Sequence, residues 1–130
     1  MSCPDCDAEQ VRLEVPSGLR EYAPESEAAV AVCTRCLRVD PGDGDTGTTG
    51  DPHEISDALP AEAPTAVALL LAVEKLSSVA LNREAIEELV AHAERSGVDY
   101  RLALERLAAD PKLDPAVDVA RRLQQFEQLS

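Results

Sequence analysis

Four cysteines in two short pairs constrain this chain more than any other feature of its sequence. The first pair is Cys3-Pro4-Asp5-Cys6 and the second is Cys33-Thr34-Arg35-Cys36. Two cysteines separated by two residues can turn their thiolates toward one cation, because the tight turn between them directs backbone N–H groups at the sulfurs. Two such turns supply the four ligands of a tetrahedron. We therefore predict one metal site, formed by Cys3, Cys6, Cys33 and Cys36.

The residues between the two pairs have the pattern of a β-hairpin. Residues 11–15 alternate apolar and polar side chains, as a half-exposed strand does, and residues 28–32 are more uniformly apolar. With its Cys-Pro-x-Cys start, this part of the chain resembles the zinc-ribbon family, and the resemblance implies a small β-hairpin ribbon around one zinc ion. The sequence departs from that family at Asp7 and Leu37, which stand where many ribbons have glycine after the second cysteine of a pair.

A site of four thiolates has the chemistry of a structural centre. Four protein ligands leave no open position for water or substrate, so a catalytic metal is disfavoured. Zinc is the predicted occupant, and a single iron ion of the rubredoxin type is the less favoured alternative. Thiol redox chemistry is a further alternative. It is disfavoured because it requires a cysteine at a helix N-terminus, and neither pair precedes a helical pattern.

Residues 65–130 have the apolar spacing of four short helices, which predicts a compact helical bundle. The first helix is apolar almost all around, so we expect it to be buried at the centre. We expect the four helices to begin at Pro64-Thr65, Asn82, Asp99 and Asp114-Pro115, where Asp114 is the N-cap and Pro115 the first helical residue. Gly97 is expected to end the second helix.

The stretch between the cysteines and the helices is predicted to be a flexible linker. Residues 41–64 contain no Lys or Arg and are rich in Gly, Pro and Asp, a composition that does not offset the entropy of ordering the chain. The predicted fold class is therefore α+β, with a zinc ribbon at 1–40, the acidic linker at 41–64 and the helical bundle at 65–130.

The charge of the chain is strongly negative. There are 12 Lys plus Arg against 25 Asp plus Glu, for a net charge of -13 at pH 7. Such acidity, with Lys75 and Lys112 as the only lysines, is typical of proteins from salt-accumulating archaea, an ordinary acidic protein being the alternative. It disfavours binding to nucleic acid or to an anionic membrane. The longest apolar run, residues 66–73, is shorter than the about 20 residues of a membrane span, so we expect a cytoplasmic protein.

The sequence predicts a binding protein rather than an enzyme. It contains no recognisable catalytic motif, and His53 and His92 are expected to lie on solvated surfaces. We predict an adaptor with an unknown protein partner. The alternative is a nucleic-acid-associated regulator that uses Arg35 and Arg38, although pairing of these arginines with Glu9, Glu14, Glu21 or the thiolates is favoured.

The whole chain also resembles small, uncharacterised haloarchaeal proteins that begin with Cys-Pro-x-Cys and end in an acidic helical domain. Residues 81–85, 113–115 and 120–122 carry the resemblance in the C-terminal part. This likeness implies no activity.

Overall fold

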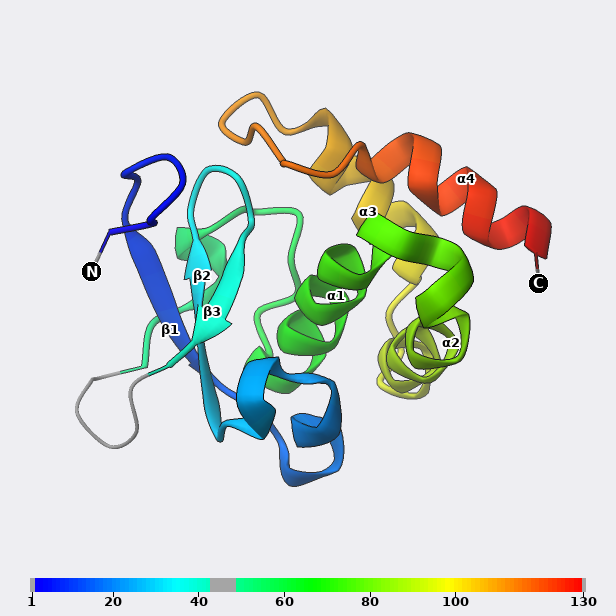
Figure 1. Cartoon of the computed structure of the whole chain (residues 1–130), viewed down its shortest axis with the longest axis horizontal. Coiled ribbons are helices and arrows are strands. Elements are labelled where there is room, and N and C mark those ends of the chain that lie inside the picture. Colours follow the sequence, from blue (N-terminus) through cyan, green and yellow to red (C-terminus); the bar gives the residue numbers. More distant parts are fainter. Residues whose placement is uncertain (1, 43–48, 130) are drawn as a thin grey trace.

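The computed structural model describes residues 2–42 and 49–129 and shows a small sheet beside a group of helices (Figure 1). The strands are β1 (Gln10–Glu14), β2 (Ala29–Cys33) and β3 (Val39–Pro41), and the α-helices are α1 (Ala63–Lys75), α2 (Val79–Arg95), α3 (Tyr100–Ala109) and α4 (Val119–Leu129). Short 3-10 helices are η1 (Ser17–Tyr22), η2 (Pro24–Ser26), η3 (Pro52–Glu54) and η4 (Leu76–Ser78). The predicted α+β class, with strands before helices, is confirmed.

The sheet is antiparallel, in the order β1-β2-β3. Leu13 of β1 lies opposite Val30 of β2, and Val32 lies opposite Val39 of β3. Burial alternates along β1, whereas every residue of β2 is buried. These patterns explain the two strand sequences, because an edge strand with one solvated face alternates and a central strand covered on both faces does not.

Helix α1 occupies the centre of the molecule, as predicted. Residues 65–73 are all buried, and the helix contacts β1 and β3 as well as α2 and α3. By length and composition alone, the helical stretch Ala63–Arg95 is apolar enough to cross a membrane, but 61% of its most apolar window is buried inside the fold. A helix in the core of a folded domain can be equally long and apolar, so length and composition are weak evidence of a membrane span.

The predicted ends of the second and third helices are partly correct. The Asp99 carboxylate caps α3 by accepting the Leu102 N–H at 3.2 Å, and Gly97 ends α2 with a φ of 86°. The prediction for Asn82 is wrong, since α2 begins at Val79. Asn82 lies in the first turn of α2 and donates its side-chain amide to the Lys75 carbonyl at 3.2 Å.

The predicted start of the last helix is also wrong. Helix α4 begins at Val119, and the Asp118 carboxylate accepts an N–H of its first turn at 3.2 Å. The Asp114-Pro115 dipeptide lies earlier, in the loop formed by residues 110–118. The N–H of Asp114 donates to the Arg35 carbonyl at 2.7 Å, so a contact with the sheet region replaces the local cap.

Residues 49–62, part of the stretch expected to be a flexible linker, differ from that expectation by packing against the sheet and helices. Asp51 and Glu54 form a capping box around η3, and Ile55 and Leu59 are buried. The Gly50 N–H also donates to a carbonyl oxygen of β1 at 2.8 Å. Residues 43–48 of the predicted linker lie outside the described residues. The hydrophobic core runs from the sheet through this segment into the helices.

A buried serine joins residues 49–62 to the end of α3. The Ser56 hydroxyl, which is 0% exposed, donates to the Asp110 carboxylate at 2.6 Å. This bond, and the backbone N–H of Lys112 at 2.9 Å, lower the pKa of Asp110 below its ordinary value. A carboxyl group whose pKa is lower in the folded than in the unfolded state stabilises the fold at pH values above its unfolded-state pKa. This stabilisation is lost as the pH falls through the folded-state pKa.

We expect Ser56→Ala to lower the free energy of unfolding by about 1–3 kcal/mol at neutral pH. The difference from wild type should shrink as the pH falls through the lowered pKa of the Asp110 carboxylate, which then becomes protonated. Urea denaturation at neutral and acidic pH measures both values. Ser77→Ala, at an exposed position, is the matched control. An equal loss at both pH values would contradict the role of the ionised carboxylate.

Candidate metal centre

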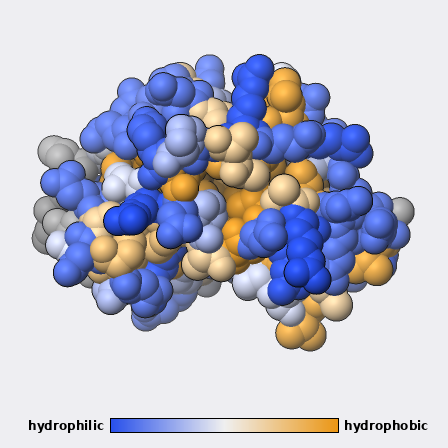
Figure 2. All heavy atoms as spheres, turned by 90° about the horizontal axis from the view of Figure 1, so that it is seen from above, coloured by the Kyte–Doolittle hydropathy of each residue, from blue (hydrophilic) through white to orange (hydrophobic). Residues whose placement is uncertain are grey.

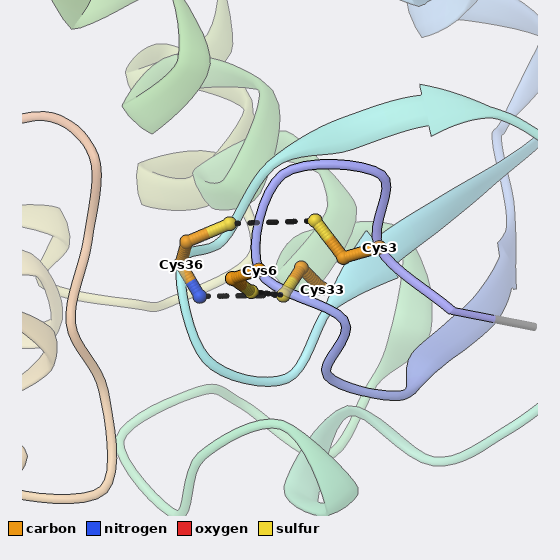
Figure 3. Close-up of side chains that lie close together, drawn as sticks. All are labelled: Cys3, Cys6, Cys33 and Cys36. Carbon is orange, nitrogen blue, oxygen red and sulfur yellow. Dashed lines mark hydrogen bonds between the residues drawn. The ribbon is translucent and has the colours of Figure 1, made fainter.

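The four cysteine sulfurs converge at one end of the sheet (Figure 3). Cys3 and Cys6 lie in the turn before β1, Cys33 is the last residue of β2, and Cys36 lies in the turn before β3. All four sulfurs lie within 4.8 Å of one another, with 3.3 Å between Cys6 and Cys33 and 3.7 Å between Cys3 and Cys36. Tetrahedral bonds of about 2.3 Å to zinc place neighbouring sulfurs about 3.8 Å apart. The predicted four-cysteine cluster is therefore present, and its spacing suits one cation.

The two cysteine turns have the same backbone form. The Cys3 N–H donates to the Ala8 carbonyl at 2.8 Å, and the Cys33 N–H donates to the Arg38 carbonyl at 2.9 Å. In the second turn, the N–H groups of Arg35 and Cys36 also face the Cys33 sulfur, at 3.4 and 3.3 Å. Backbone dipoles aimed at a sulfur favour its thiolate form, which is the form that binds metal.

Asp7 and Leu37 both adopt the left-handed backbone conformation that glycine would adopt most easily. Their φ values are 64° and 62°. Aspartate tolerates this conformation, whereas for a residue such as leucine it costs about 1–2 kcal/mol. The Leu37 side chain is only 2% exposed, and its burial contributes about 1.5–3 kcal/mol, which offsets the strain. The departures from the ribbon pattern thus leave the turn geometry intact.

The cluster is partly shielded from water, which makes a negative charge on its sulfurs costly. Cys3 and Cys33 are 0% exposed, and all four cysteines are free thiols. Burial, above all, and contacts with the neighbouring thiols raise the pKa of Cys36 to about 12, while a hydrogen bond with the backbone of Arg38 acts in the opposite direction. Thiolates in this position therefore require a positive partner, which a bound cation would supply.

The two candidate arginines of the second turn have different surroundings. Arg38 donates to the Asp5 carboxylate at 2.7 Å and to the Asp40 carboxylate at 3.0 Å, and these bonds raise its pKa further above the ordinary range. Its partners differ from the ones considered in the sequence, but the pairing is intramolecular as favoured there. Arg35 is exposed, and its side chain forms no ion pair within the described part of the chain.

The 110–118 loop is hydrogen-bonded to the second cysteine turn. Its Asp114 N–H donates to the Arg35 carbonyl at 2.7 Å, and its Ala116 N–H donates to the Cys36 carbonyl at 3.3 Å. The same turn is also bonded to the residue before β1. The hydroxyl and the N–H of Thr34 donate to the Glu9 carbonyl, at 2.8 and 2.9 Å. The sequence did not predict this contact, because Asp114-Pro115 has the pattern of a helix start and such a pattern indicates no distant partner.

The two histidines lie outside this centre. The His53 ring nitrogen Nε2 is 2.9 Å from the Leu59 carbonyl oxygen, and His53 is exposed as expected. His92 is half-buried on α2, which the sequence did not indicate. Within residues 2–42 and 49–129, the four cysteines form the one group of side chains spaced for a metal ion.

Comparison with known proteins identifies a family without indicating an activity. The model of a family described as "Family of unknown function (DUF6276)" matches residues 2–130. No curated protein and no solved structure matches the chain significantly. The geometry of the cysteine site must therefore carry the functional argument.

Proposed function

This chain belongs to the DUF6276 family of unknown function, and we propose that it is a zinc-binding adaptor protein. Cys3, Cys6, Cys33 and Cys36 hold one zinc ion as a structural centre, and the folded chain binds another protein rather than catalysing a reaction. The observation that carries the proposal is the convergence of four sulfurs within 4.8 Å.

The donor set supports zinc over the alternatives. Four sulfurs in a tetrahedral arrangement suit zinc or a single iron ion, and zinc is the usual occupant of closed structural sites. Neither cysteine pair stands at the N-terminus of a helix, since β1 follows the first pair and β3 follows the second. The helix N-terminus that lowers the pKa of many redox cysteines is therefore missing at both pairs within the described structure.

A bound zinc ion would supply the positive charge that the thiolates need. The residues of the chain then hold the site in shape: the two turns orient the sulfurs, and Arg38 connects Asp5 of the first turn to Asp40 of β3. With all four positions filled by protein, the centre has no place for substrate. Its role is to fix the second cysteine turn, and with it the sheet, against the 110–118 loop, so that the folded chain keeps the shape in which it binds a partner.

Protein is a better candidate partner than nucleic acid. Arg38 is already held by two carboxylates, and the net charge of -13 repels phosphate. Hydrophilic residues cover most of the face seen in Figure 2, with hydrophobic residues gathered near its middle. Mixed surfaces of this kind are common at protein interfaces. We also propose, from the composition, that the protein works in the cytoplasm of a salt-accumulating cell.

Metal analysis tests the zinc centre directly. We expect about one zinc per purified chain and four thiols that react slowly with a thiol reagent until a chelator is added. A folded, metal-free protein whose four thiols react freely would overturn the zinc proposal. An iron-loaded protein with the absorption of an iron–thiolate centre would replace zinc by iron.

A filter-binding measurement with DNA and RNA tests the class of partner. The adaptor proposal expects no retention of either nucleic acid. Salt-sensitive retention that is lost in the double variant Arg35→Ala, Arg38→Ala would overturn it in favour of the nucleic-acid regulator. Arg83→Ala, on α2, is the matched control for loss of an arginine.

A further inference from the structure

An exposed leucine lies beside a hollow on the side of the molecule away from the cysteines. Leu81, near the start of α2, is 86% exposed, the largest exposed fraction among the large apolar side chains exposed in the described structure. It borders a hollow of about 490 Å³ between η1 and α2. Pockets that bind ligands commonly have volumes of about 300–1,000 Å³. A partner side chain thus has both an apolar contact and room to enter.

The hollow is negatively charged, and most of that charge is not compensated. Glu21, Glu84, Glu87 and Glu88 line it. Arg83 pairs with Glu87 at 3.1 Å, whereas the other three glutamates form no ion pair within the described residues. The combination of Leu81 with three uncompensated carboxylates is complementary to an apolar side chain flanked by Lys or Arg.

The walls of the hollow are held in place by hydrogen bonds, so little ordering is needed on binding. The Lys75 ammonium donates to the Tyr22 carbonyl at 2.7 Å, which ties the end of η1 to α1. Asn82 donates to the Lys75 carbonyl at 3.2 Å, which ties α2 to the same helix end. The Lys75 ammonium also pairs with Glu74 at 3.4 Å, and within the described residues it forms no ion pair with a glutamate of the hollow. A pre-formed surface loses less conformational entropy on association.

Tyr22 lines the hollow together with Glu21 and Glu88, two of its carboxylates. Tyr22 is half-buried against the core and lines the hollow together with Leu81. Burial raises the pKa of its hydroxyl, and the charges of Glu21 and Glu88 raise it as well.

We propose that the hollow between η1 and α2 binds a short basic segment of a partner protein, with an apolar side chain on Leu81 and Lys or Arg side chains among Glu21, Glu84 and Glu88. This inference rests on the adaptor role proposed above and names the chemistry of the partner. In concentrated salt, the Debye length falls to about 3 Å, so the apolar contact carries most of the affinity, and the charges contribute mainly at lower salt.

Selection from a display library of short random peptides on the zinc-loaded full chain tests this surface. Enriched peptides should carry Lys or Arg beside a large apolar residue. In fluorescence anisotropy titrations, Leu81→Ala should weaken binding of an enriched peptide at least about tenfold, because it removes the apolar contact. The matched control is Leu102→Ala on α3, whose side chain is 46% exposed. Both variants should melt at the wild-type temperature.

The salt dependence separates the two parts of the contact. The double variant Glu84→Gln, Glu88→Gln should weaken peptide binding severalfold in about 0.2 M KCl and little in about 2 M KCl, whereas Leu81→Ala should weaken it in both. Glu105→Gln, an exposed carboxylate on α3, should change neither.

Three results would overturn the inference, and they differ in how much of the proposed function they leave standing. If Leu81→Ala binds the peptide as tightly as the wild type does, the hollow is not the binding surface, but the adaptor role is unaffected. If a preparation with one zinc per chain enriches no peptide, both the binding surface and the adaptor role are contradicted, whereas the zinc centre is not. Self-association of the chain that Leu81→Ala abolishes would make a second copy the occupant.

Discussion

Replacing Cys33 with serine will remove metal binding and lower the free energy of unfolding by about 5 kcal/mol or more. Structural zinc contributes about 10–16 kcal/mol of apparent binding energy to small domains, which is similar to the whole stability of a typical protein. Cys33 is 0% exposed, and its sulfur is the one that two backbone N–H groups face. Metal analysis and thermal denaturation followed by circular dichroism measure the two effects.

Loss of the metal in Cys33→Ser should also destabilise the 110–118 loop that precedes α4. The Arg35 and Cys36 carbonyls accept the N–H groups of Asp114 and Ala116, so a turn that loses its metal releases both bonds. We expect these two amides to exchange with solvent hydrogen faster in Cys33→Ser before the amides of α2 do. Thr34→Ser keeps the hydroxyl bond to the β1 side and all four ligands, so it should retain metal and stability. A Cys33→Ser protein with full metal content would contradict the assigned ligand set.

Leu69→Ala should have the second-largest effect, about 2–5 kcal/mol of lost stability. Leu69 is 0% exposed in the middle of α1, and the shortened side chain would leave a cavity between the sheet and the other helices. The corresponding fall in melting temperature is roughly 10 °C for a chain of this length. Leu81→Ala is the matched control, because the same atoms are removed from a side chain that is 86% exposed.

The same variant tests whether the sheet and helices unfold together. Their buried side chains form one hydrophobic cluster. In protein loaded with cobalt in place of zinc, the absorption of the metal–thiolate centre reports on the sheet, and circular dichroism reports on the helices. We expect Leu69→Ala to lower both transitions equally. A metal-site transition that stays at the wild-type temperature would instead show the separately folding ribbon and bundle expected from the composition.

The cysteine cluster and the central helix could be predicted because each depends on local spacing. Two cysteines three positions apart can share a cation whatever surrounds them, and an apolar helix such as α1 has to be buried. Asp99 was likewise predictable as a cap, since its side chain bonds within its own helix. These features need no knowledge of distant contacts.

The errors arose where a distant contact replaced a local preference. Asp114-Pro115 has the sequence of a helix start, but its N–H bonds to the second cysteine turn instead. Residues 49–62 read as a linker because only Ile55 and Leu59 supply large apolar side chains in a polar stretch, yet both are buried. The partners of Arg38 were missed for the same reason, since Asp5 becomes its neighbour only through the fold.

The contact between the 110–118 loop and the second cysteine turn also orders the events of synthesis. All four cysteines have been translated once the chain reaches Cys36, whereas Asp114 is added only after α1, α2 and α3. Domains generally fold from the N-terminal side as they emerge from the ribosome. We therefore expect the four cysteines to bind the metal while the helices are still being translated. Until the 110–118 loop has been made, the Arg35 and Cys36 carbonyls lack their N–H partners. We expect the 110–118 loop to pack afterwards onto a cysteine turn that the metal has already made rigid.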